Sequence, residues 1–181
     1  MPDHDLQLRV LNLFFGIIIL ILPILPFIVA LNTITVLLAV FAFGLFNIGV
    51  SNMVIGISEI TRDEWVKYAE IIIGIVASSI AFCLFFIIFL TSANELTPLA
   101  VVFVIIFLIV TFSTNMAGIF ESNTKRVAKM IFIAVGLSSL IILVIFLTSL
   151  FFGVNIYLIA FSLSLIIYGS SRILLGITGI S

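Results

Sequence analysis

Long apolar runs separated by short polar segments make up most of this chain. Four stretches contain no charged residue, and they run from Arg9 to Glu59, from Glu70 to Glu95, from Glu95 to Glu121, and from Lys129 to Arg172. A helix needs about 20 apolar residues to cross the hydrocarbon core of a bilayer. The two shorter stretches therefore predict one membrane-spanning helix each, and the two longer stretches predict two each.

Turn residues divide the two longer stretches. Leu31-Asn32-Thr33 follows two prolines in the first, and Phe152-Gly153-Val154-Asn155 indicates a tight reversal in the second. The pattern predicts an all-α, polytopic membrane protein in which residues 1–181 form a single transmembrane domain. The six transmembrane helices are expected at 9–30, 35–57, 67–91, 98–119, 128–151 and 155–177.

Glycines recur at matching positions of the predicted helices. The odd-numbered helices contain Gly16, Gly74 and Gly136, and a basic residue lies seven positions before each glycine: Arg9, Lys67 and Lys129. The even-numbered helices contain Gly56, Gly118 and Gly176, each followed by isoleucine, with a serine five positions before each glycine: Ser51, Ser113 and Ser171. Such a period indicates structural repeats. We predict three repeated helical hairpins at 8–60, 66–122 and 128–181.

Small residues follow one another at a spacing of seven along the even-numbered helices. Gly49 precedes Gly56 and Gly169 precedes Gly176, while Thr111 holds the corresponding place before Gly118. Small side chains give a helix a narrow face on which another backbone can lie closely, and close packing holds helices together in lipid. We interpret Gly49, Gly56, Gly118, Gly169 and Gly176 as helix-packing positions, with a substrate groove as the alternative.

Composition indicates that lipid surrounds the chain, and the basic residues indicate which side of the membrane its loops face. Hydrophobic residues make up 64% of the chain and charged residues 8%, with a mean hydropathy of +1.53, whereas a soluble domain carries about 25% charged residues. The partner of this surface is therefore the lipid bilayer, and no basic stripe suggests nucleic acid. All seven basic residues fall on one predicted face: Arg9, Arg62, Lys67, Lys125, Arg126, Lys129 and Arg172. Short basic loops stay in the cytoplasm, which predicts a multi-pass protein of the cytoplasmic membrane with both termini in the cytoplasm.

Polar residues gather near the cytoplasmic ends of the even-numbered helices. The candidate functional residues of this polar layer are Arg172, Glu59, Glu121, Glu70, Asn52 and Asn115. Polar side chains at membrane depth must find partners. The layer is interpreted either as hydrogen bonds between helices or as a polar vestibule for a solute or ion.

Arg172 is the most informative charge, because the equivalent positions of the other two repeats hold Asn52 and Thr114. An ionisable residue inside a membrane suggests a functional site. Its candidate partners are Glu59, Glu121 and Glu70. The alternative is that its long side chain reaches the cytoplasmic headgroups.

Catalytic motifs are missing from the sequence. There is no HExxH motif, no glycine-rich phosphate loop and no GxSxG motif, and the one histidine lies at the N-terminus. We therefore predict a protein without enzymatic activity, cofactor or metal.

The Gly-Ile sequence that ends each even-numbered helix resembles the HdeD family of small acid-resistance membrane proteins. The residues that carry the resemblance are Val54-Ile55-Gly56-Ile57, Ala117-Gly118-Ile119, Leu174-Leu175-Gly176-Ile177 and Ile21-Leu22-Pro23. The base and glycine in each odd-numbered helix fit this pattern too. The resemblance implies a six-helix protein of the cytoplasmic membrane linked to acid or general stress, and it assigns no functional residues.

Three functions are expected from these observations. The first is a structural or stress-protective membrane protein that works by packing, by forming a homo-oligomer or by binding a membrane-protein partner. The second is a small transporter or channel for a solute, an ion or protons. The third is an accessory subunit of a membrane complex.

Overall fold

The computed structural model describes residues 2–24, 34–58, 63–90, 93–120, 125–152 and 156–178. Over these ranges the chain forms six long helices and one short 3-10 helix: α1 (Pro2–Ile21), η1 (Leu22–Ile24), α3 (Ile34–Ser58), α4 (Glu64–Leu90), α5 (Ala93–Phe120), α6 (Arg126–Phe151) and α7 (Tyr157–Thr178). Each long helix is long and apolar enough to cross a membrane. The predicted all-α fold with six such helices is confirmed.

The first helix differs most from its predicted range of 9–30. α1 already begins at Pro2, and it gives way after Ile21 to η1, which contains Pro23. Proline lacks a backbone N–H, and its ring clashes with the carbonyl group four residues earlier, so that an α-helix tends to end before it. The predicted continuation of one α-helix through Pro23 is therefore wrong, and residues 25–33 lie outside the described part of the chain.

The fourth predicted helix, 98–119, begins earlier than expected. α5 starts at Ala93 and contains Pro98. Pro98 has no backbone N–H to donate to the carbonyl of Asn94, so the turn before it is held by one helical hydrogen bond fewer. The other four helices begin and end within three residues of their predicted limits.

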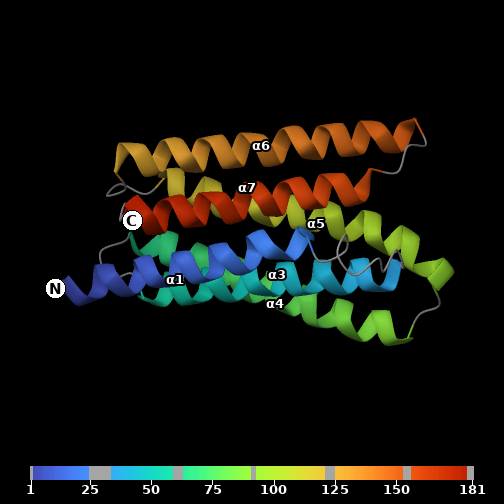
Figure 1. The fold of residues 1–181 in the computed structure, drawn as a ribbon, viewed down its shortest axis with the longest axis horizontal. Helices are drawn as coiled ribbons and strands as arrows, with labels where there is room; N and C mark the ends of the chain where they lie inside the picture. Colours follow the sequence, from blue (N-terminus) through green and yellow to red (C-terminus); the bar gives the residue numbers. More distant parts are fainter. Residues whose placement is uncertain are drawn as a thin grey trace.

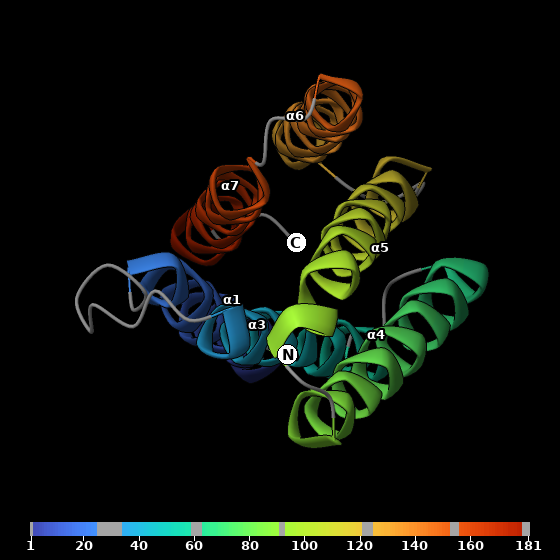
Figure 2. The ribbon, with the colours of Figure 1, turned by 90° about the vertical axis from the view of Figure 1, so that its right-hand side faces the viewer.

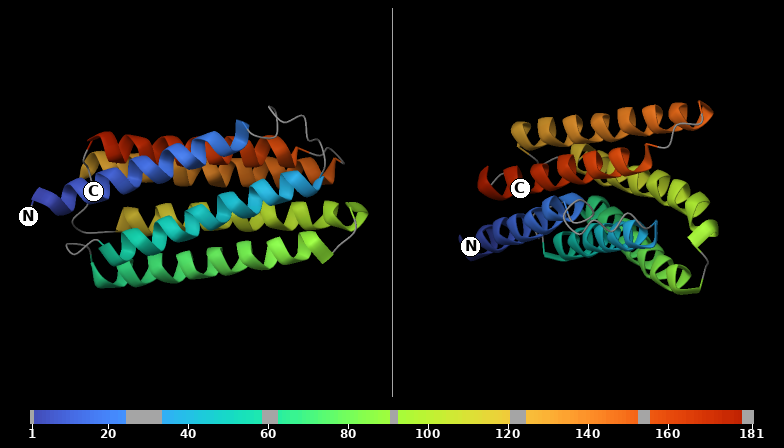
Figure 3. Two further views of the ribbon diagram at one scale, coloured as in Figure 1. Left: turned by 60° about the horizontal axis from the view of Figure 1, so that its bottom comes forward. Right: turned by 45° about the vertical axis from the view of Figure 1, so that its right-hand side comes forward.

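The long helices lie side by side along one axis, with both chain ends at the same end of the bundle (Figure 1). Seen from the end, their order around the bundle is α1, α3, α4, α5, α6 and α7 (Figure 2). α3, α5 and α7 also contact one another, and we call them the inner helices. The first turns of α1 project past the neighbouring helices, as the left view of Figure 3 shows.

Burial separates the inner helices from α1, α4 and α6, which we call the outer helices. In the apolar spans of α3, α5 and α7, 61%, 50% and 61% of the residues are buried, against 39%, 28% and 33% for α1, α4 and α6. The surface of the outer helices is rich in large apolar side chains such as Phe82, Phe86 and Ile141. Such a surface is suited to lipid rather than water.

The closest helix pairs are α3 with α4, α1 with α7, and α5 with α6. Each outer helix therefore packs most closely on an inner helix outside its own predicted hairpin. The first and last helices of the chain are neighbours for this reason, as Figure 1 shows. The two helices of each predicted hairpin also touch, but less extensively. The repetition of the hairpins stays a prediction.

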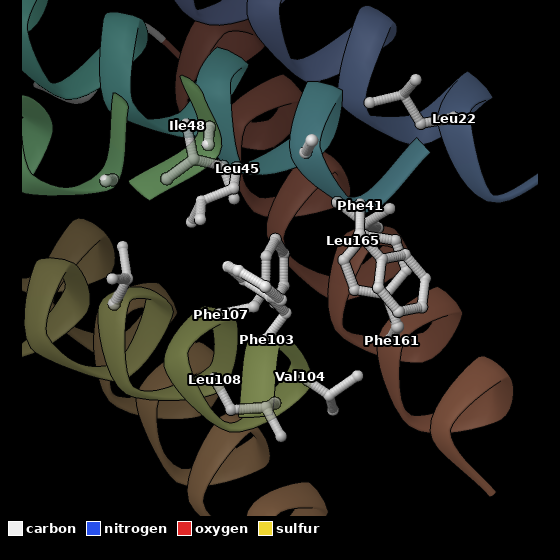
Figure 4. Close-up of a cluster of buried hydrophobic side chains, with 14 of the residues drawn as sticks. Leu22, Phe41, Leu45, Ile48, Phe103, Val104, Phe107, Leu108, Phe161 and Leu165 are labelled. Atoms are coloured by element: carbon white, nitrogen blue, oxygen red, sulfur yellow. The ribbon is translucent and has the colours of Figure 1, made fainter. Parts of the chain in front are cut away.

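Phenylalanine side chains fill the space between the inner helices (Figure 4). Phe41, Phe103 and Phe161 are buried, and each lies fifteen residues before the last glycine of its helix. The Phe161 ring packs edge-on against Phe107, with 4.7 Å between the ring centroids, an arrangement that aromatic pairs favour. This apolar packing occupies the half of the bundle away from the chain ends.

Candidate functional site

Arg172 lies inside the bundle with only 5% of its surface exposed. It is six residues before the end of α7, about 9 Å along the helix axis. Its Nε donates a hydrogen bond to the Tyr168 hydroxyl at 3.1 Å, and its Nη1 donates to Asn12 Oδ1 at 3.2 Å. Its Nη2 donates to the Tyr168 hydroxyl at 2.7 Å and to Asn52 Oδ1 at 3.0 Å. All three guanidinium nitrogens are therefore bonded to other side chains of the bundle.

Asn52 extends these contacts from α7 to α5. Its Oδ1 accepts the Arg172 bond and a second one from the Tyr168 hydroxyl at 3.3 Å, while its Nδ2 donates to Thr114 Oγ1 at 2.9 Å. Thr114 Oγ1 in turn donates to the carbonyl of Val110 at 2.9 Å. We call Arg172, Tyr168, Asn12, Asn52 and Thr114 the Arg172 network. It connects α1 and the three inner helices.

The inner helices contribute equivalent positions to this network. Arg172, Asn52 and Thr114 each lie four residues before the last glycine of their helix. Although the sequence shows three different side chains at these positions, the fold brings them together in one chain of hydrogen bonds. Positions that match by their spacing to the glycines in the sequence are therefore in contact in the structure.

Glu70 is the buried acidic candidate, with 3% of its surface exposed on α4. A Cβ atom built on Gly56 would lie 3.5 Å from the Glu70 Cβ, so the two helices are close at this level. Glu59 and Glu121, the other predicted partners of Arg172, lie outside the described residues.

Asn115 is buried but bonds within its own helix. Its Nδ2 donates to the carbonyl of Thr111 at 2.6 Å, and Asn47 makes the same type of bond to Phe43 at 2.7 Å. Such bonds to the preceding turn satisfy a polar side chain without a second helix. These two amides therefore donate within their own helices, whereas Asn52 donates across to Thr114 on α5.

Tyr168 and Asn12 belong to the network although the sequence analysis did not single them out. Tyr168 lies four residues before Arg172, a spacing that puts both on one helix face, and the guanidinium carbon lies 5.1 Å from the centroid of its ring. Asn12 interrupts the apolar stretch that follows Arg9. A lone asparagine in a spanning helix signals an interhelical hydrogen bond.

In two of the three closest helix pairs, glycines of both helices lie opposite each other with little space between the backbones. A Cβ atom built on Gly49 would lie 2.8 Å from the carbonyl oxygen of Gly74, and one on Gly169 would lie 3.0 Å from that of Gly16. Backbone atoms cannot rotate away, so no larger residue fits without moving a helix.

The remaining predicted packing glycines face side chains or backbone of the outer helices. A Cβ atom on Gly176 would lie 2.9 Å from the carbonyl oxygen of Arg9, and one on Gly56 would lie 3.2 Å from that of Lys67. One on Gly118 would lie 2.7 Å from the ring of Phe132. In the α5–α6 pair Thr111 replaces the second glycine, which fits the smaller contact between those two helices.

Arg9 holds the end of α7. Its Nε donates to the carbonyl of Gly176 at 3.1 Å, and its Nη2 donates to that of Ile177 at 2.9 Å. The last carbonyl groups of a helix lack partners within the helix, and a cation next to them is also favoured by the helix dipole. Arg9, about two turns into α1, thus attaches the first helix to the last one.

The described residues contain no cluster of three or more potential metal ligands. No protein-family model, curated protein or solved structure matches this chain. The candidate site therefore rests on its own geometry.

Tyr168→Phe is expected to reduce the free energy of unfolding by about 1 kcal/mol, within the range of side-chain hydrogen bonds measured in membrane proteins. The change removes the oxygen that accepts from Arg172 and donates to Asn52. Reversible unfolding in mixed detergent micelles, followed by circular dichroism, measures the loss. Tyr68→Phe on the exposed face of α4 is the matched control, and equal losses in both variants would argue against the network.

Proposed function

We propose that this chain is a non-enzymatic, multi-pass protein of the cytoplasmic membrane, built as three repeated hairpins with both termini in the cytoplasm. It acts through packing or partner binding in a stress or acid-resistance role like that of the HdeD family. The arrangement of both chain ends at one end of the bundle supports this topology (Figure 1). The basic residues Arg9, Lys67 and Lys129 near that end support the cytoplasmic assignment.

The hydrogen bonding of Arg172 within the bundle supports packing over transport most directly. Each of its nitrogens donates to a side chain of the same bundle, so the guanidinium group is engaged without a solute. In the other half of the bundle, Phe41, Phe103 and Phe161 fill the space between the inner helices. A pathway for a polar solute requires polar groups along its length, and these side chains offer none.

A flux assay in proteoliposomes tests this proposal. With a pH gradient across the membrane, we expect the rate of proton or solute movement for the wild-type protein to equal that of protein-free vesicles, and Arg172→Ala to leave it unchanged. Gradient dissipation is followed with a pH-sensitive dye enclosed in the vesicles. Flux through the wild-type protein that disappears in Arg172→Ala would overturn the packing role.

A small transporter or channel is the second candidate, because the buried layer contains ionisable groups. Arg172 and Glu70 are both less than a tenth exposed, and buried charges in spanning helices often belong to ion or proton pathways. If the buried layer only packed the helices together, neutral side chains would be sufficient there. An accessory or homo-oligomeric role fits the outer helices, whose apolar surfaces can meet lipid or another membrane protein.

A further inference from the structure

A crevice of about 290 Å³ lies where the last turn of α3 meets the first two turns of α4. Gly56 and Ile57 line it from α3, and the charged residues that line it from α4 are Glu64 and Lys67. These helix ends lie at the end of the bundle that carries the chain ends, as the left view of Figure 3 shows. At about 30 Å³ for each water molecule, the crevice has room for roughly ten water-sized groups. A small polar headgroup therefore fits into it.

At the corresponding place of the α1–α7 pair, an arginine side chain contacts the helix end. Arg9 holds the position on α1 that Lys67 holds on α4, seven residues before the glycine of its helix. Its guanidinium group donates to the carbonyl of Gly176 at 3.1 Å and to that of Ile177 at 2.9 Å. In the α3–α4 pair, the Gly-Ile end of α3 and Lys67 instead line the crevice. The same position of the repeat therefore joins two helices in one pair and borders an open space in the other.

The acid at this crevice is particular to α4. Glu64 lies ten residues before Gly74, and the residues ten positions before the matching glycines are Leu6 on α1 and Arg126 on α6. Glu64 precedes Lys67 by three residues, a spacing that puts both side chains on one face of the helix. The crevice thus presents a negative and a positive group next to each other.

The surroundings of the crevice match the boundary between headgroups and acyl chains. Trp65, the neighbour of Glu64, is half-exposed, and tryptophan is enriched where a membrane meets water. Further along α4, Ile72 and Ile75 are also exposed, and they offer an apolar surface along the helix. An occupant with a polar head at the crevice and an apolar tail along α4 has the chemistry of a membrane lipid.

We propose that this crevice binds the headgroup of phosphatidylethanolamine, a zwitterionic phospholipid with a primary ammonium group. Lys67 donates to the phosphate, and the Glu64 carboxylate accepts N–H hydrogen bonds from the ammonium group. The quaternary ammonium group of phosphatidylcholine has no N–H to donate. A headgroup that is only negative would bring two negative groups together at Glu64. The inference rests on the membrane placement in the proposed function and is independent of whether the protein packs, binds partners or transports a solute.

Contacts of Lys67 within the protein are compatible with this role. Lys67 also interacts with other groups of the chain, and an ammonium group has three N–H donors. It can therefore keep a protein partner while it donates to a phosphate oxygen. The rival interpretation is that Glu64 and Lys67 serve only each other, as residues at this helical spacing can, and that the crevice accepts any lipid. The two interpretations differ in the headgroup preference that they predict.

Trp65 gives a direct readout of that preference, because it is the only tryptophan of the chain and lies next to Glu64. The full chain is reconstituted in phosphatidylcholine vesicles that contain an equal fraction of one lipid with brominated acyl chains, which quench tryptophan fluorescence. The brominated lipid is phosphatidylethanolamine, phosphatidylcholine or the anionic phosphatidylglycerol. From the quenching of Trp65 we expect a relative affinity about threefold higher for phosphatidylethanolamine than for phosphatidylcholine, the size expected for solvent-exposed ion pairs.

Substitutions of the acid should change this preference in a defined way. Glu64→Gln should make the relative affinities for phosphatidylethanolamine and phosphatidylcholine equal. Glu64→Arg gives α4 the side chain that α6 has at this position, and it should shift the preference to phosphatidylglycerol. Lys129→Gln, at the position on α6 that matches Lys67, is the control and should leave the preference at Trp65 unchanged.

Flotation of the vesicles on a density gradient separates failure of the site from failure of the membrane placement. Protein that floats with the vesicles but whose Trp65 is quenched equally by the three lipids would overturn the lipid site and leave the proposed function standing. A preference for phosphatidylethanolamine that persists in Glu64→Gln would overturn the site as well. Protein that does not float would overturn both.

Discussion

Replacing Gly74 with alanine is expected to lower the free energy of unfolding by about 2–3 kcal/mol, at the upper end of typical overpacking costs. The added Cβ atom would lie 2.6 Å from the carbonyl oxygen of Gly49 and 2.9 Å from the backbone nitrogen of Met53. Both atoms belong to the α3 backbone, so no side-chain rotation relieves the overlap. The two helices must separate along the closest contact in the bundle, and close packing is what holds helices together in lipid.

Gly136→Ala is the matched control for this experiment, because Gly136 holds the corresponding position on α6. A Cβ atom there would lie 3.7 Å from the Cβ of Asn115 and 4.0 Å from the ring of Phe112, which are ordinary contact distances. Alanine favours a helix over glycine by about 1 kcal/mol. We therefore expect Gly136→Ala to be neutral or stabilising.

Unfolding of both variants in mixed micelles, followed by circular dichroism, measures the two effects side by side. Equal losses for Gly74→Ala and Gly136→Ala would mean that the contact between α3 and α4 is not closer than that between α5 and α6. A gain in stability for Gly74→Ala would contradict the geometry directly.

The sequence predicted the helices well because a bilayer imposes a simple length rule on apolar stretches. Glycine spacing also identified residues that lie at close helix contacts, such as Gly49 and Gly169. It did not identify the opposing helix, because a narrow face has no feature that specifies its partner. The pairing of α1 with α7 depends on how all six helices close into a bundle.

The Arg172 network shows the same division between what local sequence reveals and what the fold adds. Arg172 and Asn52 could be selected because charged and amide side chains are conspicuous in an apolar helix. Tyr168 was overlooked because tyrosine is common near membrane interfaces. Asn12 was overlooked because it lies just after Arg9, where polar residues are ordinary. Only the packing of α1 against α7 brings Asn12 to Arg172.

Arg172→Met is expected to have the largest effect of any change in the polar layer, lowering the free energy of unfolding by about 3 kcal/mol. A single side-chain hydrogen bond in a membrane protein contributes only about 0.6 kcal/mol on average, since the unfolded chain in the membrane also finds partners. Arg172 donates four such bonds, to Tyr168, Asn12 and Asn52. Its loss therefore removes several contacts at once and leaves buried acceptors such as Asn12 Oδ1 without a donor.

Arg172→Lys separates the contribution of charge from that of geometry. Lysine keeps the positive charge but has one nitrogen, which cannot donate to Asn12 on α1 and to Asn52 on α3 as a planar guanidinium group does. We expect it to recover less than about half of the loss caused by Arg172→Met, while Arg126→Met, on the exposed start of α6, leaves the unfolding free energy unchanged. Full recovery by lysine would show that charge alone stabilises the layer, and an unchanged stability of Arg172→Met would show that the network does not hold the inner helices together. The free energy of unfolding is expected to be lowest for Arg172→Met, intermediate for Arg172→Lys and highest for the wild type. This order follows because Arg172 is the one side chain of the network that bonds to both an outer helix and another inner helix.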